Sequence, residues 1–202
     1  KGGPGLKASG FGVGSVDLPD WNGLATSDAA KRAQAVEQNA AYIRACAAAG
    51  MKTFFVVVMT ENTAAPAAER YRLAVEGYGA LAPALKETGS WVVIEGWPGP
   101  TALITTPEGY RALFKDCPAP LAVNYDPSHL IRMGIDPIRF LREFAPLVRH
   151  VHAKDTELFP EALYEFGHQV PPLLAKPHGF GGASWRYTIP GHGVSRWKKI
   201  FD

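Results

Sequence analysis

Short apolar runs alternate along this chain with longer amphipathic segments, and this alternation limits the available folds more than any other feature. The runs 52–60 (KTFFVVVMT), 91–96 (WVVIEG) and 121–126 (LAVNYD) are rich in β-branched and aromatic residues, as buried strands are. Strand-like runs separated by helix-like segments predict a parallel sheet with right-handed crossovers. Two closures fit this pattern, an open doubly wound sheet and a closed barrel.

Helix signals lie between the apolar runs. Ser27 or Asp28 is suited to cap a helix that Gly50 ends, and Pro107 stands in the favoured first turn of a later helix. In chain order we expect a weak strand at 6–14, helices at 28–49, 69–86, 107–115 and 137–148, a strand at 149–155, an irregular segment at 156–188 and a helix beginning within 195–201.

Polar residues at the ends of three apolar runs favour the barrel. WVVIE, LAVNYD and RHVHAKD each finish with carboxylate or imidazole groups. The C-terminal ends of the strands are where a (β/α) barrel builds its active site. No glycine-rich phosphate fingerprint follows any run, which argues against a nucleotide-binding open sheet.

We therefore predict an α/β chain with the (β/α)8 TIM barrel fold, forming one domain over residues 1–202. A complete barrel has eight units and about 250 residues. Five or six strands are visible in these 202 residues, so we expect the barrel to be incomplete at both ends, without its first unit and last strand.

Composition narrows the function classes. The net charge of +2 is small and its Lys and Arg residues are dispersed, which argues against a nucleic-acid partner. Two cysteines are too few for a disulfide scaffold, and no apolar run approaches the roughly 20 residues of a membrane span. The first residues lack the features of a signal peptide, so a cytoplasmic enzyme is the expected class.

Three residues at the strand ends are candidates for chemistry. Glu95 follows only apolar residues, and a carboxylate there is costly to bury unless it binds a metal or forms a salt bridge. Asp126 ends its run and begins DPSH, where it is either a ligand or a turn residue. His129 lies three residues later, either in the same pocket as Asp126 or on a surface loop.

The run RHVHAKD at 149–155 contains two histidines and a lysine. His150 and His152 share one strand face, and His152 is nearer the expected barrel mouth. We interpret His150 mainly as a core histidine. Lys154 lies on the His152 face, where its ammonium is suited either to stabilise an oxyanion or to form a salt bridge with Asp155 or Glu157.

One imidazole and two carboxylates make an oxygen-rich site. Such a site suits Mn²⁺, Mg²⁺ or Co²⁺, and also Zn²⁺ with an open position. A divalent metal polarises the carbonyl and hydroxyl pair of a sugar and lowers the pKa of the adjacent C–H. A carboxylate then removes that proton as a general base.

The ordered set WVVIEG, NYDPSH, VHAKD and PGHGVSRWKKIF resembles the sugar phosphate isomerase/epimerase superfamily, the xylose isomerase-like TIM barrels. The resemblance covers about residues 5–202. In that family a Glu after strand four, an Asp after strand five, a His on strand six and a Glu on strand eight bind one divalent metal. The resemblance to this family implies that Glu95, Asp126 and His152 are metal ligands and that His129 contacts the substrate.

The fourth ligand of the family has no match here. The acids downstream of the VHAKD motif do not stand in a strand-eight context, which supports the expectation of a chain incomplete at its end. In the epimerase members the strand-four and strand-eight glutamates form an acid/base pair, which implies Glu95 as one catalytic base beside Lys154. The downstream acids are Glu157, Glu161, Glu165 and Asp202.

The segment 156–188 is longer than family barrels usually carry. Its aromatic and basic side chains, with Trp97, are suited to wall a sugar pocket. The alternative is a structural loop packed over the barrel. The pocket candidates are Trp97, His178, Trp185 and Arg186.

The leading hypothesis is a metal-dependent sugar or keto-sugar isomerase or epimerase that acts through an enediolate. A lyase or dehydratase using the same intermediate is the second hypothesis. A nuclease like endonuclease IV is disfavoured, because no histidine precedes His129. A non-catalytic barrel subunit or scaffold is the remaining alternative. The expected partner is a small carbohydrate, with no membrane and no nucleic acid, and such barrels often pair as homo-oligomers.

Overall fold

The computed structural model describes residues 14–168 and 171–202. The chain divides into two compact units, which are described separately. The first contains residues 1–124 and 147–150, and the second contains residues 125–146 and 151–202. The weak strand expected at 6–14 lies outside the described residues except for Gly14.

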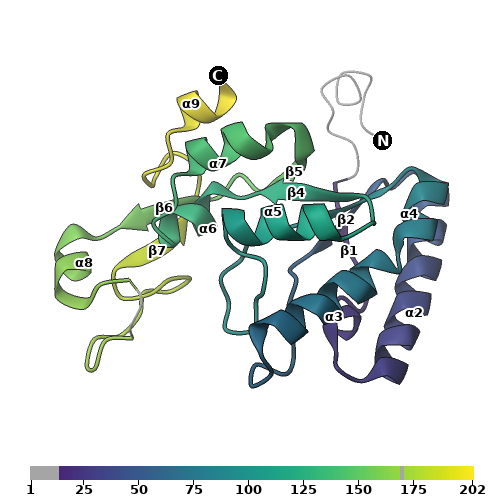
Figure 1. Ribbon diagram of the computed structural model, residues 1–202. Coiled ribbons are helices and arrows are strands. Elements are labelled where there is room, and N and C mark those ends of the chain that lie inside the picture. The colour runs from purple at the N-terminus through teal and green to yellow at the C-terminus, as the bar shows by residue number, and fades with distance from the viewer. Residues whose placement is uncertain (1–13, 169–170) are drawn as a thin grey trace. The chain divides into compact units, whose positions relative to one another are not determined.

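A five-stranded sheet organises the first unit (Figure 1). Its strand order equals the chain order, and the pairings β1–β2, β2–β3 and β3–β4 are all parallel. Sequential parallel strands joined by helices confirm the α/β class and agree with part of a TIM barrel. The strands are β1 (Val16–Asp17), β2 (Thr53–Val56), β3 (Trp91–Ile94), β4 (Leu121–Tyr125) and β5 (Val148–Val151).

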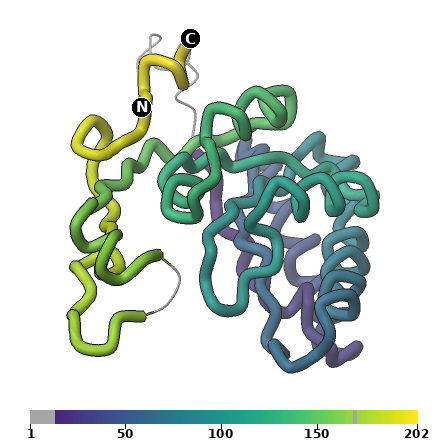
Figure 2. The backbone as a smooth tube through the Cα atoms, turned by 60° about the vertical axis from the view of Figure 1, so that its left-hand side comes forward, coloured from purple at the N-terminus to yellow at the C-terminus, as the bar shows by residue number. Residues whose placement is uncertain are grey.

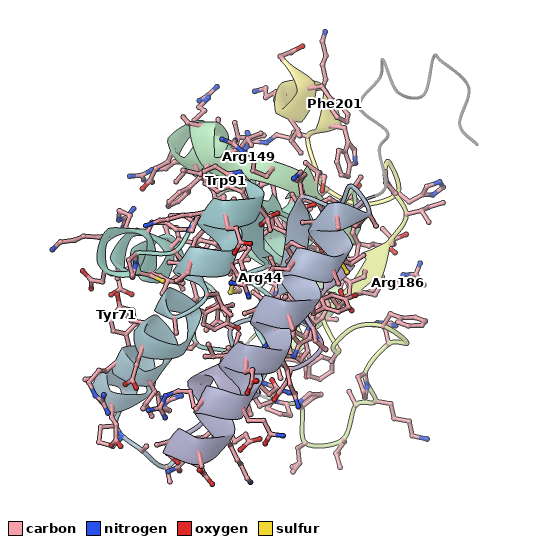
Figure 3. All side chains as sticks on the ribbon, turned by 90° about the vertical axis from the view of Figure 1, so that its right-hand side faces the viewer. Arg44, Tyr71, Trp91, Arg149, Arg186 and Phe201 are labelled. Atoms are coloured by element: carbon pink, nitrogen blue, oxygen red, sulfur yellow. The ribbon has the colours of Figure 1, made fainter. Side chains whose placement is uncertain are left out.

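The central strands are largely apolar on both faces, as strands covered on both faces are, with Asn124 as the polar exception in β4. All five residues of β4 are buried, as are the last three of β3. At the rim of the sheet, the Arg149 guanidinium lies 5.0 Å from the centre of the Trp91 ring (Figure 3). This is a cation–π contact between β5 and β3.

The helices of the first unit begin at recognisable caps. Asp28 accepts hydrogen bonds from the amides of Ala30 and Lys31, which confirms the expected first helix. This helix packs on α4, and α3 packs on the 3₁₀ turn η1 (Figure 2). The elements are η1 (Gly23–Ala25), α2 (Ala29–Ala48), α3 (Ala67–Gly79), α4 (Ala82–Thr88) and α5 (Pro107–Asp116).

The single helix expected at 69–86 is wrong, because α3 and α4 are separate helices. Pro83 has no amide hydrogen and its ring clashes with the carbonyl four residues earlier, so it is tolerated only in the first turn. The structure places it there, at the start of α4.

The second unit contains helices and a two-stranded antiparallel sheet. The strands β6 and β7 pair from Asp155↔Thr188 to Leu158↔Trp185. The elements are α6 (Pro127–Arg132), α7 (Pro137–Phe144), the 3₁₀ turn η2 (Ala145–Leu147, whose last residue belongs to the first unit), β6 (Asp155–Leu158), α8 (Pro160–Phe166), β7 (Trp185–Thr188) and α9 (Trp197–Phe201).

Three expectations for this region need correction. The strand expected at 149–155 ends at Val151, and a different strand begins at Asp155. The segment 156–188 is not wholly irregular, since it contains α8 and β7 as well as most of β6. The helix expected to reach Val148 ends at Phe144, because Pro146 cannot donate an amide hydrogen bond to continue it.

Asp155 ties the segment after β7 to β6. Its carboxylate is completely buried and accepts five hydrogen bonds, four of them from backbone amides. Burial alone raises the pKa of this carboxyl, but the hydrogen bonds from Ser195, Trp197 and Thr156 outweigh it and hold the pKa below its usual range. Among the described residues no helix is both long and apolar enough to cross a lipid bilayer.

Candidate functional site

In the first unit, Glu95 is a buried carboxylate directly after β3. Its backbone amide donates to the carbonyl of Val56, which continues the β2–β3 ladder by one residue. The Asn124 side chain, from the buried strand β4, donates to Glu95 Oε2 at 2.7 Å. Asn124 Oδ1 lies 2.8 Å from His150 Nδ1.

This contact fixes how the three side chains share protons. The amide nitrogen of Asn124 is the donor to Glu95, so its oxygen is the acceptor facing His150. His150 therefore carries a proton on Nδ1. Asn124 links a carboxylate and an imidazole, and in doing so it orients Glu95 from the neighbouring strand.

In the second unit, the two carboxylate oxygens of Asp126 contact different groups. It is the N-cap of α6, with Oδ1 accepting from the Ser128 amide at 2.9 Å and from the Ser128 hydroxyl at 2.6 Å. Oδ2 lies 3.0 Å from Lys154 Nζ and 3.3 Å from His129 Nε2. The sequence predicts Asp126 as a ligand or a turn residue and does not predict this short helix, although an Asp cap followed by Pro is a helix-start signal.

His129 is almost completely buried, one turn into α6. Its Nδ1 lies 2.7 Å from the hydroxyl of Tyr187 on β7, and its Nε2 lies 3.1 Å from Lys154 Nζ. Arg132 also donates to the Tyr187 hydroxyl, at 3.1 Å. The surface-loop alternative for His129 is therefore wrong, because its ring is enclosed.

Tyr187 was missed by the sequence reasoning. The strand WRYT alternates, so Trp185 and Tyr187 share one face and Arg186 takes the other. On the first face, Arg132 stacks over the Trp185 ring at 4.3 Å. The signal that was available is this period-two pattern of aromatic residues inside the segment taken as irregular.

The remaining candidates lie in different surroundings. Arg186 is exposed (Figure 3), and it forms an ion pair with Glu157 at 2.6 Å. His178 is also exposed, and its ring lies 4.3 Å from the Phe159 ring. Within the second unit, Arg186 and His178 therefore form one group around Phe159, and Trp185 belongs to the other face of β7.

Trp97 and His152 follow strands β3 and β5. Trp97 is half-buried in the loop of the first unit, where its ring packs closely over Gly99. His152 is half-buried in the second unit, and its backbone amide donates to the Tyr125 carbonyl at 3.0 Å. Because β5 ends at Val151, the strand alternation used to group His152 with Lys154 does not apply beyond that residue.

The donor set fits a divalent cation. In the second unit, the buried Asp126 carboxylate and His129 imidazole are groups of the types that bind metals, and Asp126 Oδ2 lies 3.3 Å from His129 Nε2. A buried carboxylate is costly without a positive partner, and in the second unit the Lys154 ammonium is such a partner for Asp126 Oδ2. The site chemistry thus favours positive charge beside Asp126.

Comparison with known proteins gives a family match over nearly the whole chain. The family model of xylose isomerase-like TIM barrels matches residues 5–202. Inosose dehydratase of Geobacillus thermodenitrificans is 28% identical over 135 residues, which is 66% of this chain and 42% of that protein. The chain thus spans less than half the length of this curated relative.

Solved structures share the fold at low identity. The 3-keto-D-glucoside 4-epimerase YcjR of E. coli superposes with a TM-score of 0.67 and 15% identity, covering 97% of this chain and 68% of YcjR. The IolI protein, solved with a bound zinc atom, gives a TM-score of 0.66 and 18% identity, covering 95% of this chain and 64% of IolI. The proteins to which this chain is similar thus include one named as a dehydratase and one named as an epimerase.

Proposed function

Because the chain belongs to the family of xylose isomerase-like TIM barrels, we propose that it acts as a divalent-metal-dependent isomerase or epimerase on a sugar or keto-sugar derivative. The observation that carries the proposal is the buried Asp126 carboxylate, whose Oδ2 holds the Lys154 ammonium at 3.0 Å. A buried carboxylate paired with a cation immediately after a parallel strand is suited to metal chemistry at the carboxyl end of a barrel.

The proposed metal ligands are the three that the family resemblance implies, Glu95, Asp126 and His152, and the buried His129 beside Asp126 is a further candidate. The two carboxylates are buried, which raises the cost of leaving them without positive charge. Mn²⁺, Mg²⁺, Co²⁺ and Zn²⁺ all suit such a set, and the zinc atom described for the IolI protein supports a divalent ion in general.

When bound, the metal polarises neighbouring carbonyl and hydroxyl oxygens of the sugar. Glu95, oriented by Asn124, takes the proton from the carbon next to the carbonyl as general base. The Lys154 ammonium stabilises the negative charge of the resulting enediolate. The half-buried aromatic ring of Trp97 is suited to contact the sugar ring.

A dehydratase is the second candidate. The similarity to inosose dehydratase, at 28% identity over 135 residues, favours it. The same enediolate expels a hydroxyl group from the neighbouring carbon, and this group leaves as water by taking the proton that Glu95 removed, so that the proton is not returned to carbon. The two reactions therefore share Glu95 as the base and differ in the fate of the intermediate.

Metal content is the first test. Wild type, Asp126→Asn and Asp136→Asn are loaded with Mn²⁺ or Zn²⁺, dialysed and measured by mass spectrometry of the metal and by thermal unfolding. Asparagine is a good N-cap, so both variants keep their helix starts while losing one charge. We expect one metal per chain in wild type and Asp136→Asn, and loss of metal in Asp126→Asn. Absence of metal from all three proteins would refute the proposal.

Turnover distinguishes the two reactions. Ketoses and keto-polyols are incubated with the metal-loaded protein in D₂O. An epimerase incorporates deuterium at the carbon beside the carbonyl and otherwise gives a product of the same mass as the substrate. A dehydratase gives a product that is lighter by one water. We expect Glu95→Gln to lose deuterium incorporation while keeping the fold, and unchanged incorporation in that variant would exclude Glu95 as the base.

A further inference from the structure

A pocket of about 350 Å³ opens in the second unit, between the end of α6 and the chain that leads from α8 into β7. Its lining includes the buried Ser184 and Trp185 and the half-buried Arg132, Pro172 and Ala175. Liquid water occupies about 30 Å³ per molecule, so a pocket of this size holds roughly a dozen non-hydrogen atoms. The space thus matches a molecule of the size of one hexose.

The guanidinium of Arg132 is held in a defined orientation at this pocket. Its Cζ lies 4.3 Å from the centre of the Trp185 ring, and its Nη1 donates to the Tyr187 hydroxyl at 3.1 Å. The indole contact restrains the plane of the group, and the hydrogen bond restrains its rotation. A planar guanidinium presents its N–H donors as a fork that matches two oxygens of a carboxylate or a phosphate.

The Trp185 ring that supports Arg132 is itself closely packed. Its centre lies 4.8 Å from the centre of the Tyr187 ring. The Gly182 amide donates to the Trp185 carbonyl at 2.9 Å, and a Cβ at Gly182 would lie only 2.6 Å from Trp185 Nε1. Glycine is therefore required for this approach. Because the guanidinium has a rigid support, little side-chain freedom is lost when a ligand binds to it.

The rest of the lining is apolar or basic. Pro172 and Ala175 present carbon surfaces, and His168 is a second basic residue beside Arg132. Among the described residues that line the pocket, none is Asp or Glu. Apolar walls with a few fixed polar groups are typical of small-molecule sites. The charge of this lining favours an anionic ligand.

The pocket is distinct from the site proposed for the metal. Asp126, His129 and Lys154 are not among its lining residues. The Tyr187 hydroxyl, which accepts from Arg132, lies 2.7 Å from His129 Nδ1, so a tyrosine stands between the guanidinium and the imidazole. A ligand at Arg132 therefore occupies a place of its own in the second unit.

We propose that this pocket is a second binding site, which takes a hexose-sized organic anion. The carboxylate or phosphate group of this anion pairs with the Arg132 guanidinium, and its carbon body packs on Pro172 and Ala175. Charge-assisted hydrogen bonds are roughly twice as strong as neutral ones, so the site selects an oxyanion over a hydroxyl group. Binding needs neither a metal nor turnover, and the site thus goes beyond the proposed function.

Calorimetric titration of the metal-free protein tests the site. The probes are glucose, glucuronate and glucose 6-phosphate, which share one ring and differ in the group at its last carbon. We expect at least one of the two anions to bind about tenfold or more tightly than glucose, and to bind more weakly as NaCl is added. The preferred anion tells whether the site recognises a carboxylate or a phosphate. Anion binding no tighter than that of glucose would overturn the proposal.

Two variants locate the bound anion. Arg132→Met keeps an unbranched side chain beside Trp185 but removes the charge, and Ala175→Leu fills the pocket while leaving the guanidinium in place. We expect each to weaken anion binding by about tenfold or more. Arg139→Met removes one charge from an exposed position on α7 and is expected to bind like the wild type.

Wild-type anion affinity in Arg132→Met or in Ala175→Leu would place the anion elsewhere and overturn the proposal. Circular dichroism shows whether each variant is folded, and Ala175→Leu decides the point if Arg132→Met does not fold. Because these titrations contain no metal, failure to bind Mn²⁺ or Zn²⁺ would refute the proposed function and leave this site standing. Failure to bind either anion would refute only this site.

Discussion

Removal of the Asp155 carboxylate is expected to release the segment after β7. This carboxylate is fully buried in the second unit and has no water-exposed surface. Replacing it with Ala leaves all of its donors without a partner, and replacing it with Asn keeps one acceptor oxygen but no charge. The donors are the amides of Thr156 at 2.8 Å, Gly191 at 3.1 Å, Gly193 at 3.2 Å and Ser195 at 2.9 Å, and Trp197 Nε1 at 2.9 Å.

The magnitude follows from the number of charge-assisted bonds. Each hydrogen bond to a charged group contributes about 1.5 to 3 kcal/mol, but a released segment regains water for most of its donors. We therefore expect Asp155→Ala to lower the free energy of unfolding of the second unit by about 3 to 5 kcal/mol. Asp155→Asn should lose about half as much, because one carbonyl oxygen remains to accept.

The pH dependence has a definite sign. The pKa of Asp155 is lower in the folded protein than the usual value near 3.9, so its contribution to stability is complete above that value. That contribution is lost as the pH falls through the lowered folded pKa. The wild type should therefore lose more stability on acidification below about pH 4 than Asp155→Asn, which has no carboxyl to protonate.

Amide hydrogen exchange is the assay that isolates this effect. We expect the amides of Gly191, Gly193 and Ser195 to exchange at least tenfold faster in Asp155→Ala, while the strands of the first unit keep wild-type protection. Urea unfolding at pH 7 gives the accompanying loss of stability. Glu161→Gln, an exposed carboxylate change in the same unit, is the control. Wild-type exchange of these three amides in Asp155→Ala would refute the reasoning.

Three further predictions concern the first unit. Gly77→Ala should destabilise it by about 2 to 3 kcal/mol or prevent folding, because a Cβ would overlap the carbonyl oxygen of Leu24; thermal unfolding measures this. Asn124→Ala should lower the free energy of unfolding in urea by about 2 kcal/mol, because it removes the hydrogen bond that Asn124 donates to the buried Glu95 carboxylate. Burial raises the pKa of the Cys117 thiol, so a thiol reagent at pH 7 should modify it only on unfolding; rapid modification of the native protein would contradict this.

Local signals were sufficient for much of the fold. The cap at Asp28 and the proline at Pro107 start helices where the sequence predicted, and the apolar runs contain β2, β3 and β4. These features depend on neighbours within a few residues, so they can be read without knowing the tertiary structure. The expected TIM-barrel class follows from their order and is confirmed by the family match over residues 5–202.

The antiparallel pairing of β6 and β7 in the second unit could not be predicted from such local signals. Its strands β6 and β7 pair across a separation in which α8 and a long loop intervene, from Leu158↔Trp185 to Asp155↔Thr188. Each strand has only four residues, too few for a secure alternation. The pairing is decided by long-range hydrogen bonds, and with it the position of Tyr187 beside His129.

The sequence was sufficient to predict Asp126 as a site candidate, but it was not sufficient to predict which side chains from other elements contact it. Asp126 Oδ1 caps α6 by accepting from the Ser128 amide, a local interaction that the sequence DPS is suited to form. The other oxygen faces Lys154, which comes from the chain after β5 and is brought there by tertiary structure. Substitution with Asn separates the two tasks, since the cap survives and the charge does not. The chemistry proposed for this site therefore depends on the second oxygen, and the helix that presents it depends on the first.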